Sequence, residues 1–477
     1  MSIVNLFPNQ VDHARRLLNN IINMKLAFDI SEPGSGKTYV SVYIASQLIK
    51  LGYCDYILFI VPHESKKIWS EFVSKLSAKS NIMVHNNMSS SRYKFTKKTF
   101  VIVDEMQDLL SNSANLTFSS IIDELEKVNG SILLVSGTPF SDFARAYTLF
   151  TSLKLVNLPL GKPRIANLKA FDFRKFVTEK ANLIKKIDDG REPLTMSDCL
   201  PYDGKIVDRI AAIHQIIMKT YSSECARTLP SNLIINQVNH VYPSDYRDVE
   251  LLEEFKASPG AVMDSKLCNI HYKQLPFIAD ASIKVLKAND NAKIIVAVLH
   301  ADHANFLNLF FGKMGYSAIT ISSGVNQLGR QTAQTLFNMH NLVYRVIVVT
   351  FGVANCGISL HDNAPKELHP NGFPRTLISF VDPNPLRRTQ LLGRHIRTGI
   401  TSDVVSTILV STDAILDGVV EKNVIMEKSK ADVNLITSSL KSTKSAENFL
   451  TENVEPNKKI CKEMQDIIAS LDKYLVE

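Results

Sequence analysis

The sequence predicts an α/β protein with two lobes, each of them a parallel β-sheet covered by helices. Two observations support this fold class. Strand-like and helix-like patterns alternate in the first third of the chain, and the same alternation returns after about residue 275. The predicted strands are continuous apolar runs, which is typical of strands buried on both faces of a parallel sheet.

The first lobe is expected within residues 1–155, because strand and helix patterns follow one another closely there. A helix comes first, a short strand then leads into a glycine-rich loop, and a second helix follows that loop. Helices are predicted at 11–23 and 38–51, and strands at 25–30, 56–61, 99–103 and 131–135.

The second lobe is expected within residues 276–425, since strand-length apolar runs resume there. Its strands are predicted at 293–299, 318–321, 345–349, 377–380 and 406–410. The more irregular residues 156–275 are interpreted as an inserted or linking segment, mostly helical, and residues 426–477 as a polar helical tail. Helices are predicted in these two segments at 174–187, 207–220 and 459–475.

The composition limits the classes of protein to consider. With 477 residues, 45% of them hydrophobic, the chain can form about two to four domains with a core each. The 54 basic and 47 acidic residues give a net charge of +7, which suits a protein that binds a phosphate backbone. The 6 cysteines stand far apart, so we expect reduced thiols in an intracellular protein without a zinc site. No apolar run is long enough to span a bilayer, so no membrane partner is expected.

The most specific motif is a glycine-rich loop, residues 31–38, between a predicted strand and a predicted helix. Its backbone N–H groups can surround the phosphates of a nucleotide at the helix N-terminus. Lys37 would supply charge to the β- and γ-phosphates, and Thr38 a hydroxyl ligand for Mg²⁺. Ser31 stands where strict forms of the motif have glycine. The residues predicted to bind ATP here are Gly34, Ser35, Gly36, Lys37 and Thr38.

Two adjacent carboxylates, Asp104 and Glu105, follow an apolar strand. Parallel sheets place their chemistry at the carboxyl ends of strands, so both side chains would lie near the phosphate loop. Asp104 would bind Mg²⁺ through water, and Glu105 would polarise the water that attacks the γ-phosphate. The segment Ser136–Pro139 ends the next strand, and its hydroxyl groups can link the acidic pair to a nucleic-acid path.

A third group of residues lies far along the chain, in the second lobe. Gln390, Arg394 and Arg397 would lie along one face of a continuous helix. Guanidinium groups suit phosphoryl transfer because they stabilise charge on the γ-phosphate, so we predict these three as catalytic together with Lys37 and Glu105. A solvated basic helix is the simpler alternative. A distant arginine pair favours a two-lobed motor, since a single-lobed ATPase has no use for it.

In this order the motifs resemble those of superfamily-2 helicases and translocases. Within them the chain looks most similar to the Swi/Snf-type branch and to nucleoside triphosphatases of large cytoplasmic DNA viruses. The resemblance covers roughly residues 5–412. It implies two tandem RecA-like lobes, ATP and Mg²⁺ as cofactors, and adenine recognition by Gln10. Gln107 departs from the pattern, because histidine is commonest there in the Swi/Snf-type branch. Nucleic-acid contacts are implied at Pro62, Trp69, Ser323, Gly324 and Gly357.

The resemblance implies an ATP-dependent nucleic-acid motor, either a helicase or a translocase, with DNA as the favoured track and RNA as the alternative. Viral transcription or replication is the expected setting, with a complex of that process as partner, in host cytoplasm or virion, or alternatively in the nucleus. A competing hypothesis is a catalytically silent scaffold that binds transcription or packaging partners. A scaffold would need neither the lysine, nor the acidic pair, nor the arginines. A nuclease with an attached motor is a third hypothesis, which no strong carboxylate–lysine cluster supports.

Overall fold

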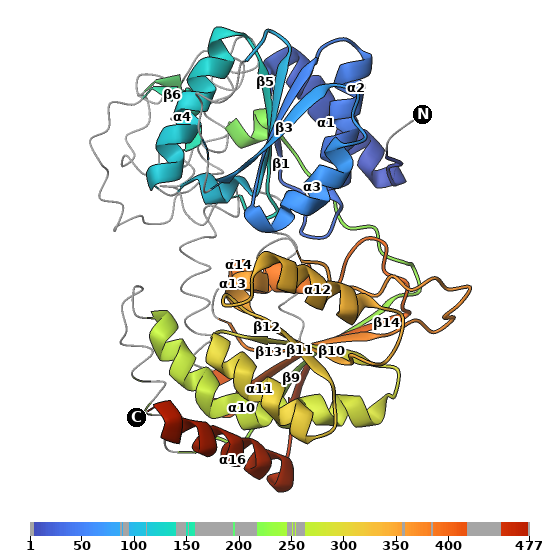
Figure 1. Ribbon diagram of the computed structural model, residues 1–477, viewed down its shortest axis with the longest axis vertical. Coiled ribbons are helices and arrows are strands. Elements are labelled where there is room, and N and C mark those ends of the chain that lie inside the picture. Colours follow the sequence, from blue (N-terminus) through green and yellow to red (C-terminus); the bar gives the residue numbers. More distant parts are fainter. Residues whose placement is uncertain are drawn as a thin grey trace, which may run out of the picture. The chain divides into compact units, whose positions relative to one another are not determined.

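The computed structural model describes residues 4–85, 88, 95–110, 112–139, 149–150, 152–157, 194–195, 217–245, 250, 253, 263–354, 358–382, 385–416 and 450–475. A first compact unit runs up to Thr228 and a second begins at Leu229 (Figure 1). Each unit contains one large β-sheet, and every strand pair in both sheets is parallel.

The first unit has a six-stranded sheet in the order β3-β2-β4-β5-β1-β8. Its strands are β1 (Leu26–Asp29), β2 (Tyr56–Val61), β3 (Lys79–Val84), β4 (Thr99–Asp104), β5 (Ser131–Val135) and β8 (Ser222–Ser223). The helices around it are α1 (Pro8–Met24), α2 (Lys37–Lys50), α3 (Lys66–Val73) and α4 (Asn112–Lys127), with short 3₁₀ turns η1 (His63–Ser65) and η4 (Met106–Leu110). Because α1, α2 and α3 cover one face and α4 the other, apolar cores lie on both sides of the sheet (Figure 1). A separate short pair joins β6 (Val156–Asn157) to β7 (Leu194–Thr195).

The second unit has a seven-stranded sheet in the order β11-β12-β10-β13-β14-β9-β15. Its strands are β9 (Ile234–Tyr242), β10 (Lys293–Val298), β11 (Ala318–Ile321), β12 (Val346–Thr350), β13 (Arg375–Phe380), β14 (Val404–Thr412) and β15 (Leu450–Asn453). Its helices are α10 (Met263–Ala288), α11 (Ala301–Lys313), α12 (Gln327–Asn338), α13 (Phe351–Ala354), α14 (Pro385–Leu392) and α16 (Lys458–Leu475). One core lies against α10, α11 and α16, and the other against α12, α13 and α14.

The predicted fold class is confirmed, since both units are parallel sheets covered by helices, as expected of tandem RecA-like lobes. The expected insertion at 156–275 contributes β8 to the first sheet and β9 to the second, and α10 begins within it. The helix predicted at 174–187 lies outside the described residues, as does most of the helix predicted at 207–220. None of the helices in the described ranges combines the length and apolar character needed to cross a membrane.

The sequence did not predict β3, β8, β9 or β15, and the reason is their position at or near the sheet edges. β9 mixes polar and apolar residues, and its first residues, Ile234 and Ile235, are exposed. β15 is exposed along its whole length. Strands that bury only part of their surface lack the continuous apolar run that marks the central strands.

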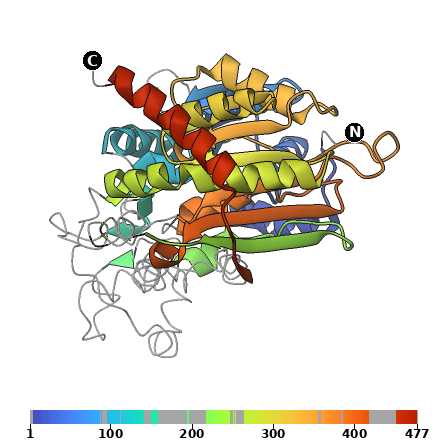
Figure 2. The same cartoon turned by 90° about the horizontal axis from the view of Figure 1, so that it is seen from below.

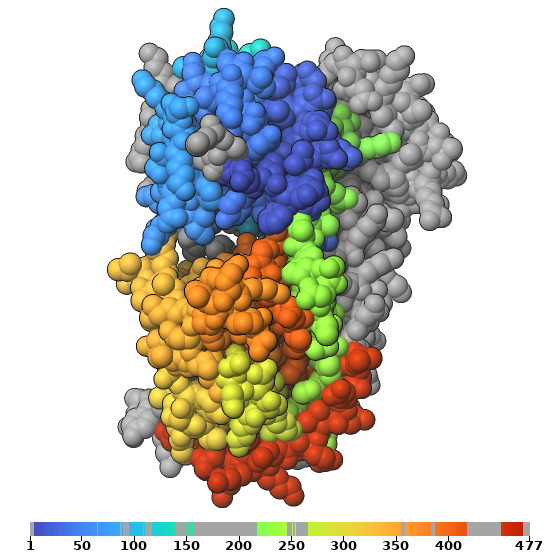
Figure 3. All heavy atoms as spheres, turned by 90° about the vertical axis from the view of Figure 1, so that its right-hand side faces the viewer, coloured from blue at the N-terminus to red at the C-terminus, as the bar shows by residue number. Residues whose placement is uncertain are grey.

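The predicted polar tail is in part an integral piece of the second unit. β15 pairs with β9, and Val454 N donates to the carbonyl oxygen of Val241 at 2.8 Å. α16 then crosses α10 and α11 (Figure 2), and Met464 is fully buried in their shared core. In the space-filling view the red C-terminal segment lies against the green of β9 (Figure 3). The apolar side of the amphipathic helix α16 therefore packs against the second unit itself.

We expect Met464→Ala to destabilise the second unit by about 2–5 kcal/mol, because it removes a buried side chain and leaves a cavity. The chain has 1 tryptophan, Trp69, which lies in the first unit. The urea midpoint of the second unit, followed by far-UV circular dichroism, should therefore fall. The midpoint of the transition followed by tryptophan fluorescence should stay unchanged. The matched control is Lys459→Ala, at an exposed position of the same helix. Equal stability of the two variants would contradict this packing role of α16.

Candidate functional site

Three loops of the first unit emerge at one edge of its sheet. The phosphate loop follows β1, the Ser136–Pro139 segment follows β5, and the acidic pair Asp104–Glu105 ends β4. These strands are neighbours, since β5 pairs with β1 on one side and with β4 on the other. Because all three are parallel, their carboxyl ends meet at the same edge, where ligands bind in open α/β sheets.

The phosphate loop has the backbone that its glycines permit. Gly34 and Gly36 have φ angles of 82° and 89°, in the left-handed region that side chains rarely adopt. Gly36 caps α2, so Lys37 and Thr38 form its first turn. The Lys37 ammonium donates to the carbonyl oxygens of Ser31 and Glu32, at 3.0 Å each. The loop thus curls around its own lysine at the N-terminus of a helix, where backbone N–H groups and the helix dipole attract anions.

Gln10 holds this loop from the side of α1. Its buried amide donates to the Ser35 carbonyl oxygen at 2.7 Å and accepts from the backbone N–H of Phe7 at 2.9 Å. A Cβ atom at Gly36 would lie 2.7 Å from Gln10 Nε2. Gln10 therefore supports the phosphate loop here, and its predicted contact with adenine stays a proposal.

The Asp104 carboxylate is held by Trp69, whose indole N–H donates to Asp104 Oδ2 at 2.9 Å. Burial, followed by the neighbouring Glu105 carboxylate, raises the pKa of Asp104 to about 6, while the bond from Trp69 opposes the rise. Within the described residues no cluster of three or more His, Cys, Asp and Glu side chains forms a metal site. The expected Mg²⁺ ligands are instead one hydroxyl, Thr38, and one carboxylate, Asp104, which are hard oxygen donors of the kind that Mg²⁺ prefers.

Trp69 and Pro62, predicted as nucleic-acid contacts, are both buried. The Trp69 side chain is 0% exposed and packs against Phe59 with ring centroids 5.3 Å apart. This corrects the expectation for Trp69, because a side chain without exposed surface cannot touch a nucleic-acid backbone. A tryptophan can bury its ring and still use its N–H, and here it orients a carboxylate of the site.

Glu105 is fixed by a chain of hydrogen bonds that runs through Gln107. In the sequence this residue stands out only because it departs from the histidine common in the Swi/Snf-type branch. Gln107 Nε2 donates to Glu105 Oε2 at 2.8 Å, and Ser136 Oγ donates to Gln107 Oε1 at 2.6 Å. Ser136 Oγ also accepts from the backbone N–H of Thr138 at 3.0 Å. Glu105 itself has φ 50°, a strained backbone for a residue with a side chain. An amide can donate and accept at once, so Gln107 joins the acidic pair to the loop after β5.

The arginine segment of the second unit differs from the predicted continuous helix. α14 ends at Leu392, and a turn begins at Gly393, so Gln390 lies on the helix while Arg394 and Arg397 lie beyond it. The two guanidinium groups nevertheless converge, since each donates to the carbonyl oxygen of Ile358 at 3.2 Å. The fold thus brings the two arginines together, although they do not lie on one continuous helix as predicted.

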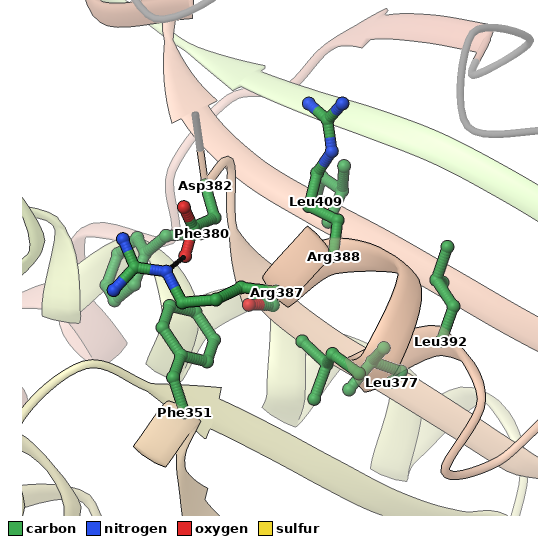
Figure 4. Close-up of a pocket in the computed structure, with 10 residues that line it drawn as sticks. Phe351, Leu377, Phe380, Asp382, Arg387, Arg388, Leu392 and Leu409 are labelled. Atoms are coloured by element: carbon green, nitrogen blue, oxygen red, sulfur yellow. Dashed lines mark ion pairs between the residues drawn. The ribbon is translucent and has the colours of Figure 1, made fainter. Parts of the chain in front are cut away.

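The neighbouring Arg387 is not a solvated basic residue. Its guanidinium forms an ion pair of 2.9 Å with the buried Asp382, beside an apolar pocket under α14 that Phe351 and Leu377 help to line (Figure 4). The guanidinium of Arg388 points away from this ion pair (Figure 4). α14 therefore packs on the carboxyl end of β13 through both charged and apolar contacts.

The remaining predicted nucleic-acid contacts differ in what the structure describes of them. Ser323 and Gly324 are exposed in the loop between β11 and α12, and Arg330 holds this loop by donating to the carbonyl oxygens of Ser323 and Val325. Gly357 lies outside the described residues. Of the predicted contacts, the Ser323–Gly324 loop is the one that the described structure leaves accessible.

No protein-family model matches the sequence, and no match is found among curated proteins. Among solved structures, the Sulfolobus solfataricus SWI2/SNF2 ATPase core in complex with dsDNA is 12% identical, with 92% of this chain and 95% of that one covered and a TM-score of 0.34. S. cerevisiae Dbp5 bound to RNA and ADP BeF3 is 10% identical, with 97% and 98% covered and a TM-score of 0.44. A DEAD box protein from the hyperthermophile Methanococcus jannaschii is 13% identical, with 95% and 98% covered and a TM-score of 0.37. All three identities are 13% or lower, and all three TM-scores are 0.44 or lower.

We expect Gly137→Ala to weaken ATP binding about tenfold, equivalent to ~1.4 kcal/mol. A Cβ atom at this position would lie 2.9 Å from Pro33 Cγ and 3.0 Å from Lys37 Nζ, so the loop and its lysine would have to shift. Titration with a fluorescent ATP analogue measures the effect. Gly312→Ala is the control, because a Cβ atom there meets nothing within 4 Å. Unchanged affinity in Gly137→Ala would contradict the expectation that space beside Lys37 limits ATP binding.

Proposed function

We propose that the protein is an ATP-dependent nucleic-acid motor, a helicase or translocase. The observation that carries the proposal is the meeting of three chemical groups at one sheet edge in the first unit. Lys37 follows β1 at the start of α2, Asp104 and Glu105 stand at the end of β4, and Gly137 follows β5, the strand between these two. Charge, metal ligand and general base for phosphoryl transfer are thereby assembled from separate parts of the sequence.

Each group has a defined role in this proposal. Lys37 and the loop N–H groups bind the β- and γ-phosphates, and Gln10 contributes to the adenine side of the same pocket. Thr38 and Asp104 would hold Mg²⁺, which neutralises charge on the phosphates when bound. Glu105 orients and polarises the attacking water, and Gln107 keeps its carboxylate in position.

The second unit supports a motor rather than a simple ATPase. Arg394 and Arg397 converge on one carbonyl oxygen, and such a pair can stabilise the γ-phosphate during transfer, with Gln390 beside it. The exposed Ser323–Gly324 loop is proposed to contact the nucleic-acid backbone. We favour DNA as the track on the Swi/Snf-type resemblance of the motifs. The setting in viral transcription or replication rests on that resemblance alone.

The test is ATP hydrolysis measured with single-stranded DNA, double-stranded DNA, RNA and no nucleic acid, followed by a strand-displacement assay. Lys37→Ala serves as the inactive control, since it removes charge from the first turn of α2 and no core volume. A motor hydrolyses ATP faster with one of these tracks. A silent scaffold binds nucleic acid without turnover, which would overturn the proposal.

Glu105→Gln is expected to bind ATP and nucleic acid normally while its turnover falls at least about 10²-fold, the size typical of lost general-base catalysis. The substitution keeps the side chain's size and its neighbour Asp104, and removes only the basic oxygen. Single-turnover hydrolysis and equilibrium ATP binding separate the two effects. An equal loss of ATP affinity would mean that Glu105 is structural.

Arg394→Ala is expected to bring nucleic-acid-stimulated hydrolysis down to the basal rate, because the γ-phosphate loses its countercharge during transfer. ATP binding by the phosphate loop should be unaffected, since that loop belongs to the first unit. The control is Lys366→Ala, an exposed lysine of the second unit that pairs with Asp403 on the surface. If the ratio of stimulated to basal hydrolysis in Arg394→Ala matched that of the control, the arginine pair would be only a basic surface.

A further inference from the structure

The chain leaves the first unit through residues 222–228, here named the strap, and the strap runs along the phosphate loop. β8, at its start, pairs with β1 directly before that loop, and Ile30 N donates to the carbonyl oxygen of Ser223 at 3.0 Å. The strap ends at Thr228, and the second unit begins with the next residue. One short segment therefore touches the nucleotide loop and continues into the second unit.

Ser31 is the first anchor of the strap, and it explains why the loop does not begin with glycine. Its hydroxyl accepts from the backbone N–H of Cys225 at 2.9 Å and donates to Asp29 Oδ1 at 2.5 Å. Asp29 is fully buried, and His13 Nε2 lies 3.2 Å from the same oxygen. Burial favours the neutral form of Asp29, but His13, Lys37 and Ser31 together lower its pKa, so it stays a strong acceptor. Glycine at position 31 would leave both Asp29 and the Cys225 N–H without this partner.

Glu32 is the second anchor. Its backbone N–H donates to the carbonyl oxygen of Cys225 at 3.3 Å, and its carboxylate accepts from Arg227 Nε at 3.2 Å and from Arg227 N at 3.4 Å. The Arg227 and Glu32 side chains are 16% and 23% exposed, so solvent screens this pair only in part. The strap is thus bound to the loop through two adjacent loop residues, Ser31 and Glu32.

Asn9 also holds the strap. Its amide donates to the carbonyl oxygen of Ala226 at 2.9 Å, and Thr228 Oγ1 donates to Asn9 Oδ1 at 2.7 Å. Asn9 directly precedes Gln10, which binds the Ser35 carbonyl oxygen on the other branch of the loop. The strap and the loop therefore share one supporting turn at the start of α1.

The two loop residues that hold the strap are also the two that bind Lys37. The Lys37 ammonium donates to the carbonyl oxygens of Ser31 and Glu32, and a phosphate competes for that same ammonium. Phosphate binding at Lys37 therefore changes the hydrogen bonding of the residues that fix the strap. Because the strap continues into Leu229, a short backbone segment joins the residues that bind Lys37 to the start of the second unit.

We propose that the strap couples nucleotide binding to the second unit, with Ser31, Glu32 and Arg227 as positioning residues. This inference rests on the proposed function, because it needs a nucleotide at Lys37. Coupling of this kind is reciprocal, so a loosened strap alters how the second unit responds to nucleotide while leaving the chemical groups of the site in place.

The closing experiment follows hydrogen–deuterium exchange of residues 222–228 with and without ATPγS and Mg²⁺, while a separate calorimetric titration measures nucleotide binding. The wild-type protein should bind nucleotide and change exchange in the strap. Arg227→Ala and Ser31→Gly should bind nucleotide with a strap response reduced at least about fivefold, the lower end of ordinary coupling effects. Arg227→Lys keeps the charge and should restore much of the response. Arg15→Ala, an exposed arginine of α1 paired with Asp12, is the matched control and should behave as wild type.

The kinetic counterpart separates coupling from damage to the fold. In Arg227→Ala the ratio of nucleic-acid-stimulated to basal hydrolysis should fall at least about fivefold, with basal hydrolysis and the KM for ATP close to wild type. Nucleotide binding without a strap response in the wild-type protein would overturn the coupling and leave the proposed function intact. Absence of nucleotide binding would overturn both.

Discussion

The parallel pairing of β1, β5 and β4 is the constraint on which the candidate ATP site depends. Residues 34–38, 104–105 and 136–138 are distant in sequence, and only the order of the strands makes their loops neighbours. The strands are short and completely apolar in their centres, so burial fixes their positions, and the polar groups of the site stand at or after their carboxyl ends. The site therefore gains its rigidity from the core beneath it.

The polar residues around this edge act mainly by orienting one another. Trp69 fixes the Asp104 carboxylate, Gln107 fixes Glu105, and Gln10 fixes the loop at Ser35. Each supporting group is itself buried or bonded to a further residue, which is the arrangement that holds reacting groups in place. The strained backbone of Glu105 fits this pattern, because such a conformation persists only where its surroundings hold it.

The second unit depends on residues brought together from far apart in the chain. β9 lies between β14 and β15, and α16 completes the core against α10 and α11. The C-terminal segment thus adds the edge strand β15 to the sheet and packs α16 on two of the helices that cover one of its faces. In the same unit the carbonyl oxygen of Ile358 accepts from both Arg394 and Arg397, so this one residue holds both guanidinium groups.

The sequence by itself determined the fold class, the central strands and the phosphate loop, because these depend on local patterns. Apolar runs such as Tyr56–Val61 and Ser131–Val135 have the bounds that were predicted, and the glycines of the loop adopt the backbone that only glycine allows readily. The tertiary structure decided the rest. A strand of mixed polar and apolar residues such as β9, next to the edge of its sheet, is stabilised by partners distant in sequence, so its own residues carry no clear period. Trp69 is a buried hydrogen-bond donor rather than a surface contact, and the arginines converge beyond the end of their helix. The presence of serine at position 31 is explained only by its hydrogen bonds with Asp29 and Cys225. Hydrogen bonds between residues distant in sequence leave no pattern in a single sequence.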